Sequence, residues 1–234
     1  MEFEPNIIYE DNHLLVVIKP QNIGVQEDES KDDDLLNLLK NYIKIRDKKP
    51  NNVFLGLVHR LDRPTGGVMV FAKTSKCASR LSEQLKNHEM TKSYLCVVCG
   101  KIKDKASRLK CYLQKDEKTN IVKLATQSDY GAKEAILDYK VLQEINNYSL
   151  IEVELLTGRS HQIRVQMSKQ LNAVIYGDIK YGDSVHKSNL ALWSYKLKFK
   201  HPISHKIMTF KASPDTTKMP WKAFNDEISR LLQN

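Results

Sequence analysis

Residues 53–73 read VFLGLVHRLDRPTGGVMVFAK, a charged turn between two apolar runs. Continuous apolar runs of this length are typical of buried strands, so both 53–58 and 68–73 are predicted to be strands. Pro64 favours an extended backbone at the residue before it, and the glycine pair at 66–67 permits positive φ or a close backbone approach. The turn at 59–67 is therefore predicted to be rigid, which suits a catalytic group.

Asp62 is the single carboxylate of this turn, and it lies between Arg60 and Arg63. Nearby positive charge favours the ionised carboxylate, and an ionised aspartate suits a nucleophile or a base better than a general acid. The alternative is structural, because an aspartate can also brace a turn by pairing with a cation. The turn alone leaves both interpretations open.

The rest of the chain predicts more strands than helices, without strict alternation of the two. This pattern indicates an α+β fold with a central mixed, largely antiparallel sheet flanked by helices and loops, in a single domain over residues 1–234. Strands are expected within 6–20 (two, around a turn at 11–12), 92–100, 108–113, 120–125, 134–145, 148–156, 190–199 and 206–212. Helices are expected at 31–46, at 76–88 with Ser75 as the cap, within 157–170 and at 220–234.

The bulk composition suggests a polyanionic partner. The 234 residues carry a net charge of +9, which favours nucleic acid, although solubility alone could explain it. Cys96 and Cys99 form a C-x-x-C pair, but their segment alternates like a strand and no second ligand pair follows at zinc-finger spacing, so we predict no metal site there. The N-terminus has no apolar signal core, and no apolar run reaches the roughly 20 residues of a membrane span, which predicts a cytoplasmic protein without membrane contact.

Two further stretches hold candidate functional side chains. In TGRSHQIRVQ, residues 157–166, Arg159 and Arg164 bracket His161 at the start of a predicted helix, where guanidinium groups and helix N-termini bind phosphate. His161 could transfer protons, but such a histidine more often fixes a turn. Tyr94 lies on the strand in KSYLCVV, where it could pack in the core or stack on a base.

Taken together, these stretches resemble the RluA-type pseudouridine synthases. The family's motifs are similar to HRLDRPTGG, to GRSHQIR at 158–164, to GDIKYG at 177–182, to the opening YEDNHLLVVIKP at 9–20 and to KSY at 92–94. The resemblance runs from about residue 6 to about residue 212, and five ordered motifs make it specific. Gly66 stands where the family usually has serine, and Trp193 where a histidine is common.

The resemblance implies that the chain isomerises uridine to pseudouridine in ribosomal or transfer RNA, as a monomer and without a metal or organic cofactor. A uracil within a helix is unreachable, so the base would be flipped out of the RNA. Asp62 would then attack either the base or the sugar carbon. Arg164 would pair with Asp62 and hold it ionised, while Tyr94 would stack on the flipped base and help to remove its C5 proton.

The remaining roles concern binding. The resemblance places Leu192 against the uracil and Arg60 near the emptied position in the RNA stack, and the substrate-binding set is completed by Arg159 and His161. We expect no separate N-terminal RNA-binding module, so phosphate contacts are assigned to a basic, broken segment, 101–123, interpreted as a mobile arm. Its candidate RNA contacts are Lys103, Lys105, Arg108 and Lys110. The alternative is a solvated surface loop.

Two other function classes compete with this interpretation. The chain could be an RNA chaperone that binds without using Asp62, although a mere binder would have no need of Asp62, Tyr94 and Arg164 together. A hydrolase that uses His59 with Asp62 is disfavoured, because no third orienting group stands at a plausible spacing.

Overall fold

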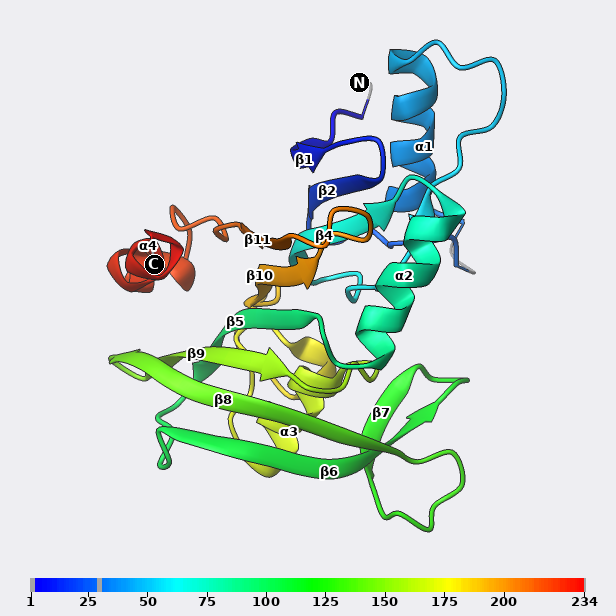
Figure 1. Ribbon diagram of the computed structural model, residues 1–234. Helices are drawn as coiled ribbons and strands as arrows, with labels where there is room; N and C mark the ends of the chain where they lie inside the picture. Colours follow the sequence, from blue (N-terminus) through cyan, green and yellow to red (C-terminus); the bar gives the residue numbers. More distant parts are fainter. Residues whose placement is uncertain (1–2, 29–30, 234) are drawn as a thin grey trace. The chain divides into compact units, whose positions relative to one another are not determined.

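The computed structural model describes residues 3–28 and 31–233, and the chain forms two compact units. The first unit contains the chain up to Met90 together with Lys196–Ala212, and the second contains Thr91–Tyr195 together with the segment from Ser213 onward. Each unit combines antiparallel strands with helices, which confirms the α+β class (Figure 1). The unit boundaries at Met90 and Tyr195 lie beside or within strands, where no change in composition signals them in the sequence.

The strands of the first unit surround β4 (Gly66–Ala72), every residue of which is buried. β4 pairs antiparallel with β2 (Leu14–Lys19), and β2 pairs antiparallel with β1 (Asn6–Glu10). The second half of β10 (Leu192–Lys200) pairs with β11 (Ile207–Lys211). Alternate residues of β2, β4 and β10 share one apolar core with helix α2 (Ser75–Lys86), in agreement with the predicted strands.

The two helices of this unit begin where a side chain caps them. The Asp34 carboxylate accepts a hydrogen bond from the Asn37 amide, so α1 spans Leu35–Arg46 and the preceding residues 31–33 lie outside it. Thr74 accepts from the Cys77 amide and caps α2, whereas the sequence had suggested Ser75 as the cap. Both helices were predicted correctly, but their first residues differ from the predicted ones. α1 begins at Leu35 instead of residue 31, and α2 begins at Ser75 instead of residue 76.

The run at 53–58 is not the buried strand that its composition predicts. Only β3 (Gly56–Leu57) is extended, it meets β4 at Ala72 and Phe71 alone, and Phe54 is 52% exposed. Gly56 passes so close to α2 that a Cβ atom there would lie 2.9 Å from the Cβ of Ala78. Only two residues of the run therefore join the sheet, and Gly56 passes beside α2 there.

The second unit is built on a long antiparallel sheet in the order β5-β9-β8-β6-β7. Its strands are β5 (Thr91–Cys99), β6 (Ala106–Asp116), β7 (Ile121–Ala125), β8 (Lys133–Ile145) and β9 (Tyr148–Leu155). The β8–β9 turn has Asn146 at φ 53°, as its two-asparagine sequence predicts. The helical segments are α3 (Gln162–Gln170), the 3-10 turns η1 (Ile179–Tyr181) and η2 (Trp221–Phe224), and α4 (Asn225–Gln233).

Segment 101–123 is more regular than the broken segment expected from its sequence. Its middle part is β6, an eleven-residue strand that pairs with β7 on one side and β8 on the other. Its pattern looks weak because only Leu109 and Leu113 are buried, while the other side chains are exposed or half-buried. A strand with one charged face lacks the apolar run that marks a central strand.

Candidate active site

A buried lysine holds the loop that carries Asp62. Lys19 is 0% exposed, and its ammonium donates hydrogen bonds to the carbonyls of Arg63 (3.0 Å), Thr65 (2.8 Å) and Pro20 (2.9 Å). The Thr65 amide donates to the Asp62 carbonyl at 2.9 Å and closes the turn. Because two acceptors of Lys19 follow Asp62 within three residues, the lysine fixes the backbone next to the carboxylate.

The charge of Asp62 acts on Lys19 in return. Burial lowers the pKa of Lys19 to about 7, the nearby Asp62 carboxylate opposes this change, and Arg63 adds to it. An ammonium supplies three donors, one for each of the three carbonyls, whereas a neutral amine has only two. The Lys19 proton and the geometry of the Asp62 loop are therefore coupled.

This coupling predicts how stability depends on pH. The unfolded chain binds the Lys19 proton with an ordinary pKa of about 10.4, and the folded chain with a pKa of about 7. Between these values the unfolded state holds more protons, so the Lys19 contribution to the unfolding free energy rises as pH increases from 7 to 10. Urea denaturation at pH 7.5 and 9.5 should show a smaller rise for Lys19→Met than for the wild type. An equal rise in the two proteins would contradict the prediction.

The two arginines beside Asp62 lie in different surroundings. The Arg63 guanidinium forms ion pairs with Asp32 at 2.7 Å and Asp28 at 3.0 Å, and Arg60 is exposed. Arg63 thus ties Asp28 and Asp32 to the loop, and its carbonyl also accepts from the Asn22 amide at 2.8 Å. Because Arg60 is exposed, its side chain is accessible to a large ligand.

His59, the base in the hydrolase alternative, already uses one ring nitrogen. Its Nε2 accepts a hydrogen bond from the Val70 amide at 3.1 Å, which anchors the start of the loop to β4. A lone pair that is engaged with the backbone does not collect a proton from a nucleophile. This contact favours a structural role for His59.

In the second unit, His161 fixes the entry to α3. It adopts a left-handed conformation with φ 51°, and its Nδ1 lies 2.6 Å from the Tyr181 hydroxyl. That hydroxyl also accepts from the Val122 amide at 3.0 Å. These contacts match the turn-fixing alternative for His161. The turn is further braced by Gln162, whose Oε1 accepts from the Arg159 amide and from the Thr157 hydroxyl.

Arg164 forms a buried ion pair with Asp178. Its Nε and Nη2 donate to the two carboxylate oxygens at 2.9 and 2.6 Å, and the two side chains are 6% and 1% exposed. The Arg164 guanidinium also lies 5.0 Å from the centroid of the Tyr181 ring. The guanidinium is therefore held in a fixed orientation. Asp178 was not identified as a site residue, although it lies in the GDIKYG motif that contributed to the resemblance.

Tyr94 and Leu192 are both buried in the second unit. Tyr94 is 6% exposed on β5, in register with Val153 of β9, and Leu192 is 4% exposed at the start of β10. Both side chains are thus largely screened from solvent. Asp62 belongs to the first unit, so its predicted pairing with Arg164 and its approach to Tyr94 stay predictions.

Three of the four basic candidates on segment 101–123 form ion pairs with carboxylates across the sheet. Lys105 pairs with Glu144 (2.8 Å), Arg108 with Asp138 (2.7 Å) and Lys110 with Glu134 (2.7 Å). Lys103 and all three paired cations are exposed. Exposed pairs are weak, so a phosphate can replace the carboxylate.

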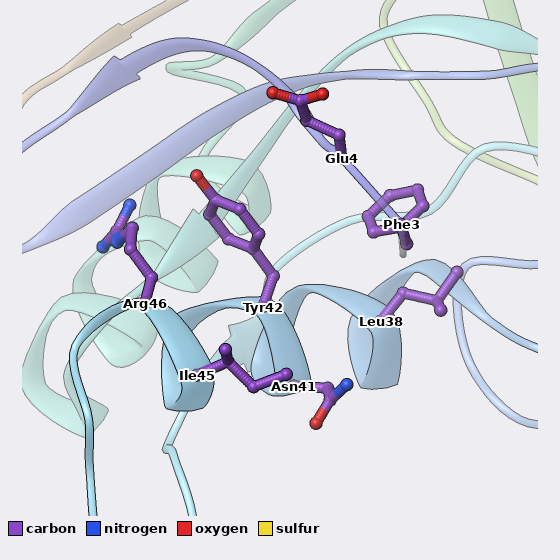
Figure 2. Close-up of a pocket in the computed structure, with 7 residues that line it drawn as sticks. All are labelled: Phe3, Glu4, Leu38, Asn41, Tyr42, Ile45 and Arg46. Atoms are coloured by element: carbon purple, nitrogen blue, oxygen red, sulfur yellow. The ribbon is translucent and has the colours of Figure 1, made fainter. Parts of the chain in front are cut away.

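A pocket of about 510 Å³ lies beside α1 in the first unit (Figure 2). The Arg46 side chain at its edge pairs with Glu10 and Asp47 and lies over the Tyr42 ring. Its charge is therefore already neutralised. None of the site residues predicted from the sequence lines this pocket, whose walls are Phe3, Glu4, Leu38, Asn41, Tyr42, Ile45 and Arg46.

Comparison with known proteins identifies similar chains. Residues 13–169 match the model of the family described as RNA pseudouridylate synthase. The chain is 37% identical over 197 residues to the ribosomal large subunit pseudouridine synthase D of Borreliella burgdorferi, with 82% of this chain and 60% of that protein covered. It is 32% identical over 232 residues to the tRNA pseudouridine synthase C of Vibrio cholerae, with 89% and 91% covered.

Solved structures share the fold. Human RNA pseudouridylate synthase domain containing 4 superposes with a TM-score of 0.77 at 21% identity, covering 96% of this chain and 93% of the other. The chain thus spans most of one curated relative and three fifths of another. In residues 3–28 and 31–233, no helix is both long and apolar enough to cross a bilayer.

Proposed function

Because the chain belongs to the RNA pseudouridylate synthase family, we propose that it isomerises uridine to pseudouridine in ribosomal or transfer RNA. The family match at 13–169 carries the proposal, since it spans Asp62, Tyr94 and Arg164 as well as Lys19, which holds the Asp62 loop. The match also crosses the boundary at Met90, which supports treating both units as one catalytic domain. We propose a monomeric cytoplasmic enzyme.

The proposed reaction begins when a uridine leaves the RNA stack. Asp62 attacks the base or the sugar carbon, and the bond between N1 and C1′ breaks. The detached uracil turns, a bond forms between C5 and C1′, C5 loses its proton and N1 gains one. Uridine and pseudouridine have the same atoms, so the reaction needs no oxidant, reductant or added group.

The side chains of the second unit receive roles on the strength of the motifs. Arg164 is proposed to keep Asp62 ionised, and its bidentate pair with Asp178 supports a guanidinium set in one orientation. Tyr94 and Leu192 are proposed to contact the flipped uracil. Arg159 and His161 are proposed to shape the turn against which substrate binds, supported by the hydrogen bonds that brace it.

The Tyr94→Phe variant keeps the aromatic ring and lacks the hydroxyl, so it tests the roles of the two groups separately. The variant should bind RNA as tightly as the wild type, because the stacking face is retained. If the hydroxyl helps to remove the C5 proton, product formation should fall by about a hundredfold or more, the usual contribution of a positioned acid–base group. Single-turnover assays at saturating RNA measure this step. A wild-type rate would restrict Tyr94 to stacking.

We further propose that the exposed cations of segment 101–123 bind phosphate. Lys103, Lys105 and Lys110 should be changed together to Ala. The slope of log affinity against log salt concentration should then become less steep by about two to three. Single-turnover chemistry at saturating RNA should stay near the wild-type rate, because these side chains do not touch the base. Filter binding at several salt concentrations measures the slope, and an unchanged slope would place the phosphate contacts elsewhere.

The biological substrate can be found by mapping pseudouridines in RNA from cells that lack the gene. We expect one or a few sites in ribosomal or transfer RNA to lose pseudouridine and to regain it when the wild-type gene is restored. Restoring the Asp62→Asn gene should not recover them. Recovery by that variant would favour the RNA chaperone, whose binding assists another enzyme.

A further inference from the structure

Three potential metal ligands meet in the second unit, at the end of β5 and in the loop after η1. The Cys99 thiol, the Asp183 carboxylate and the His186 imidazole each place a ligand atom within 4.8 Å of the other two. His186 Nδ1 lies 3.9 Å from Cys99 Sγ and 2.9 Å from Asp183 Oδ2. Nothing in the proposed isomerisation uses this cluster.

The separation between the sulfur and nitrogen ligands fits one small cation, whereas the 2.9 Å between His186 Nδ1 and Asp183 Oδ2 is a hydrogen-bond distance that must open to about 3.4 Å when both atoms bind the ion. With zinc–sulfur and zinc–nitrogen bonds of about 2.3 and 2.1 Å, a tetrahedral ion holds its sulfur and nitrogen ligands about 3.6 Å apart. The observed 3.9 Å between Cys99 Sγ and His186 Nδ1 is close to this value. Thiolate, imidazole and carboxylate together are ligands typical of zinc, whereas magnesium and calcium prefer oxygen alone.

Surrounding groups hold two of the three ligands in place, as they do around known metal sites. The second ring nitrogen of His186 lies 3.2 Å from the Tyr148 hydroxyl, and the Tyr176 ring stacks on the imidazole with centroids 4.0 Å apart. Asp183 accepts hydrogen bonds from the amides of Gly177, Val185 and His186. The carboxylate and the imidazole are thus oriented before any ion arrives.

We propose that Cys99, Asp183 and His186 bind a divalent ion of the zinc class, with water as the fourth ligand. The site uses only one cysteine of the C-x-x-C pair: Cys96 is completely buried, and residues three apart on a strand point to opposite faces. The ion would join the end of β5 to the segment that follows Asp178. Its role is to stabilise this segment, and the proposal stands independently of the isomerase activity.

Cobalt is the probe for this site, because a thiolate bound to Co²⁺ gives a charge-transfer band that oxygen and nitrogen ligands do not give. Titrating the purified full chain with Co²⁺ should produce this band and tetrahedral d–d bands, saturating at one ion per chain, and Zn²⁺ should bleach them. Cys99→Ser should lose the charge-transfer band. His186→Gln should bind cobalt at least tenfold more weakly, and Cys111→Ser, a half-buried thiol outside the cluster, should behave as the wild type.

Melting curves provide a second measurement. Zn²⁺ should raise the melting temperature of the wild type and of Cys111→Ser, and should leave that of His186→Gln unchanged. Circular dichroism establishes that each variant is folded before titration. The proposal is overturned if folded wild-type protein gives no thiolate band with Co²⁺, or if Cys99→Ser keeps the band while Cys111→Ser loses it.

Discussion

Asp62→Asn should lower the rate of isomerisation by at least about a thousandfold, the scale of loss expected when a nucleophile is removed. The amide has nearly the shape of the carboxylate but cannot attack carbon. RNA affinity should stay near the wild-type value, because the amide keeps the shape of the carboxylate and the Lys19 and Thr65 contacts to the loop involve backbone atoms. Single-turnover kinetics and filter binding measure the two quantities.

The matched control is Asp215→Asn, which makes the same chemical change at an exposed aspartate. It should leave rate and affinity unchanged. Asparagine can deamidate back to aspartate, so intact-mass measurement must establish the identity of the Asp62→Asn protein. A rate within tenfold of the wild type from verified protein would remove Asp62 from the role of nucleophile.

Asp178→Ala should lower the free energy of unfolding by about 3–5 kcal/mol, because it leaves the buried Arg164 guanidinium without its bidentate partner. The loss reflects an uncompensated charge in the interior. Asp178→Asn should cost less, since its side chain retains one acceptor. Urea denaturation monitored by circular dichroism gives the free energy of each variant.

The comparison variant is Asp138→Ala, which breaks a bidentate arginine pair of similar geometry at the surface. Arg108 stays hydrated there, so the change in unfolding free energy should be small. If Asp178→Ala and Asp138→Ala lowered the free energy of unfolding equally, the buried pair of Arg164 would contribute no more to stability than the exposed pair of Arg108.

Local sequence patterns predicted most of the secondary structure. Apolar alternation and the asparagine turn identified β8 and β9, and amphipathic spacing identified α1 and α2. The errors fall in segments whose secondary structure depends on contacts with residues that are distant in the sequence. Only Gly56 and Leu57 of the apolar run at 53–58 join the sheet, and β6 looks broken because one of its faces carries charges that pair across the sheet.

The candidate site residues also fall into two groups: those that a local motif points to, and those whose roles depend on contacts with distant parts of the sequence. Asp62, Tyr94 and Arg164 are proposed as catalytic residues because their motifs have recognisable spacing. Lys19 and Asp178 entered the sequence analysis only as parts of the motifs at 9–20 and 177–182. Their roles depend on contacts 44 and 14 residues away along the chain, and local patterns do not report such contacts. A lysine at the end of a buried strand and an aspartate in a glycine-rich turn were the available signals.

The most direct test of the central claim is tritium release from RNA labelled at uridine C5. Formation of a bond at C5 must expel the hydrogen there, so purified wild-type protein should release tritium from ribosomal or transfer RNA over many turnovers, and Asp62→Asn should release none above background. The RNA chain should stay intact. No release from either RNA class by folded wild-type protein, or equal release by Asp62→Asn, would contradict the account.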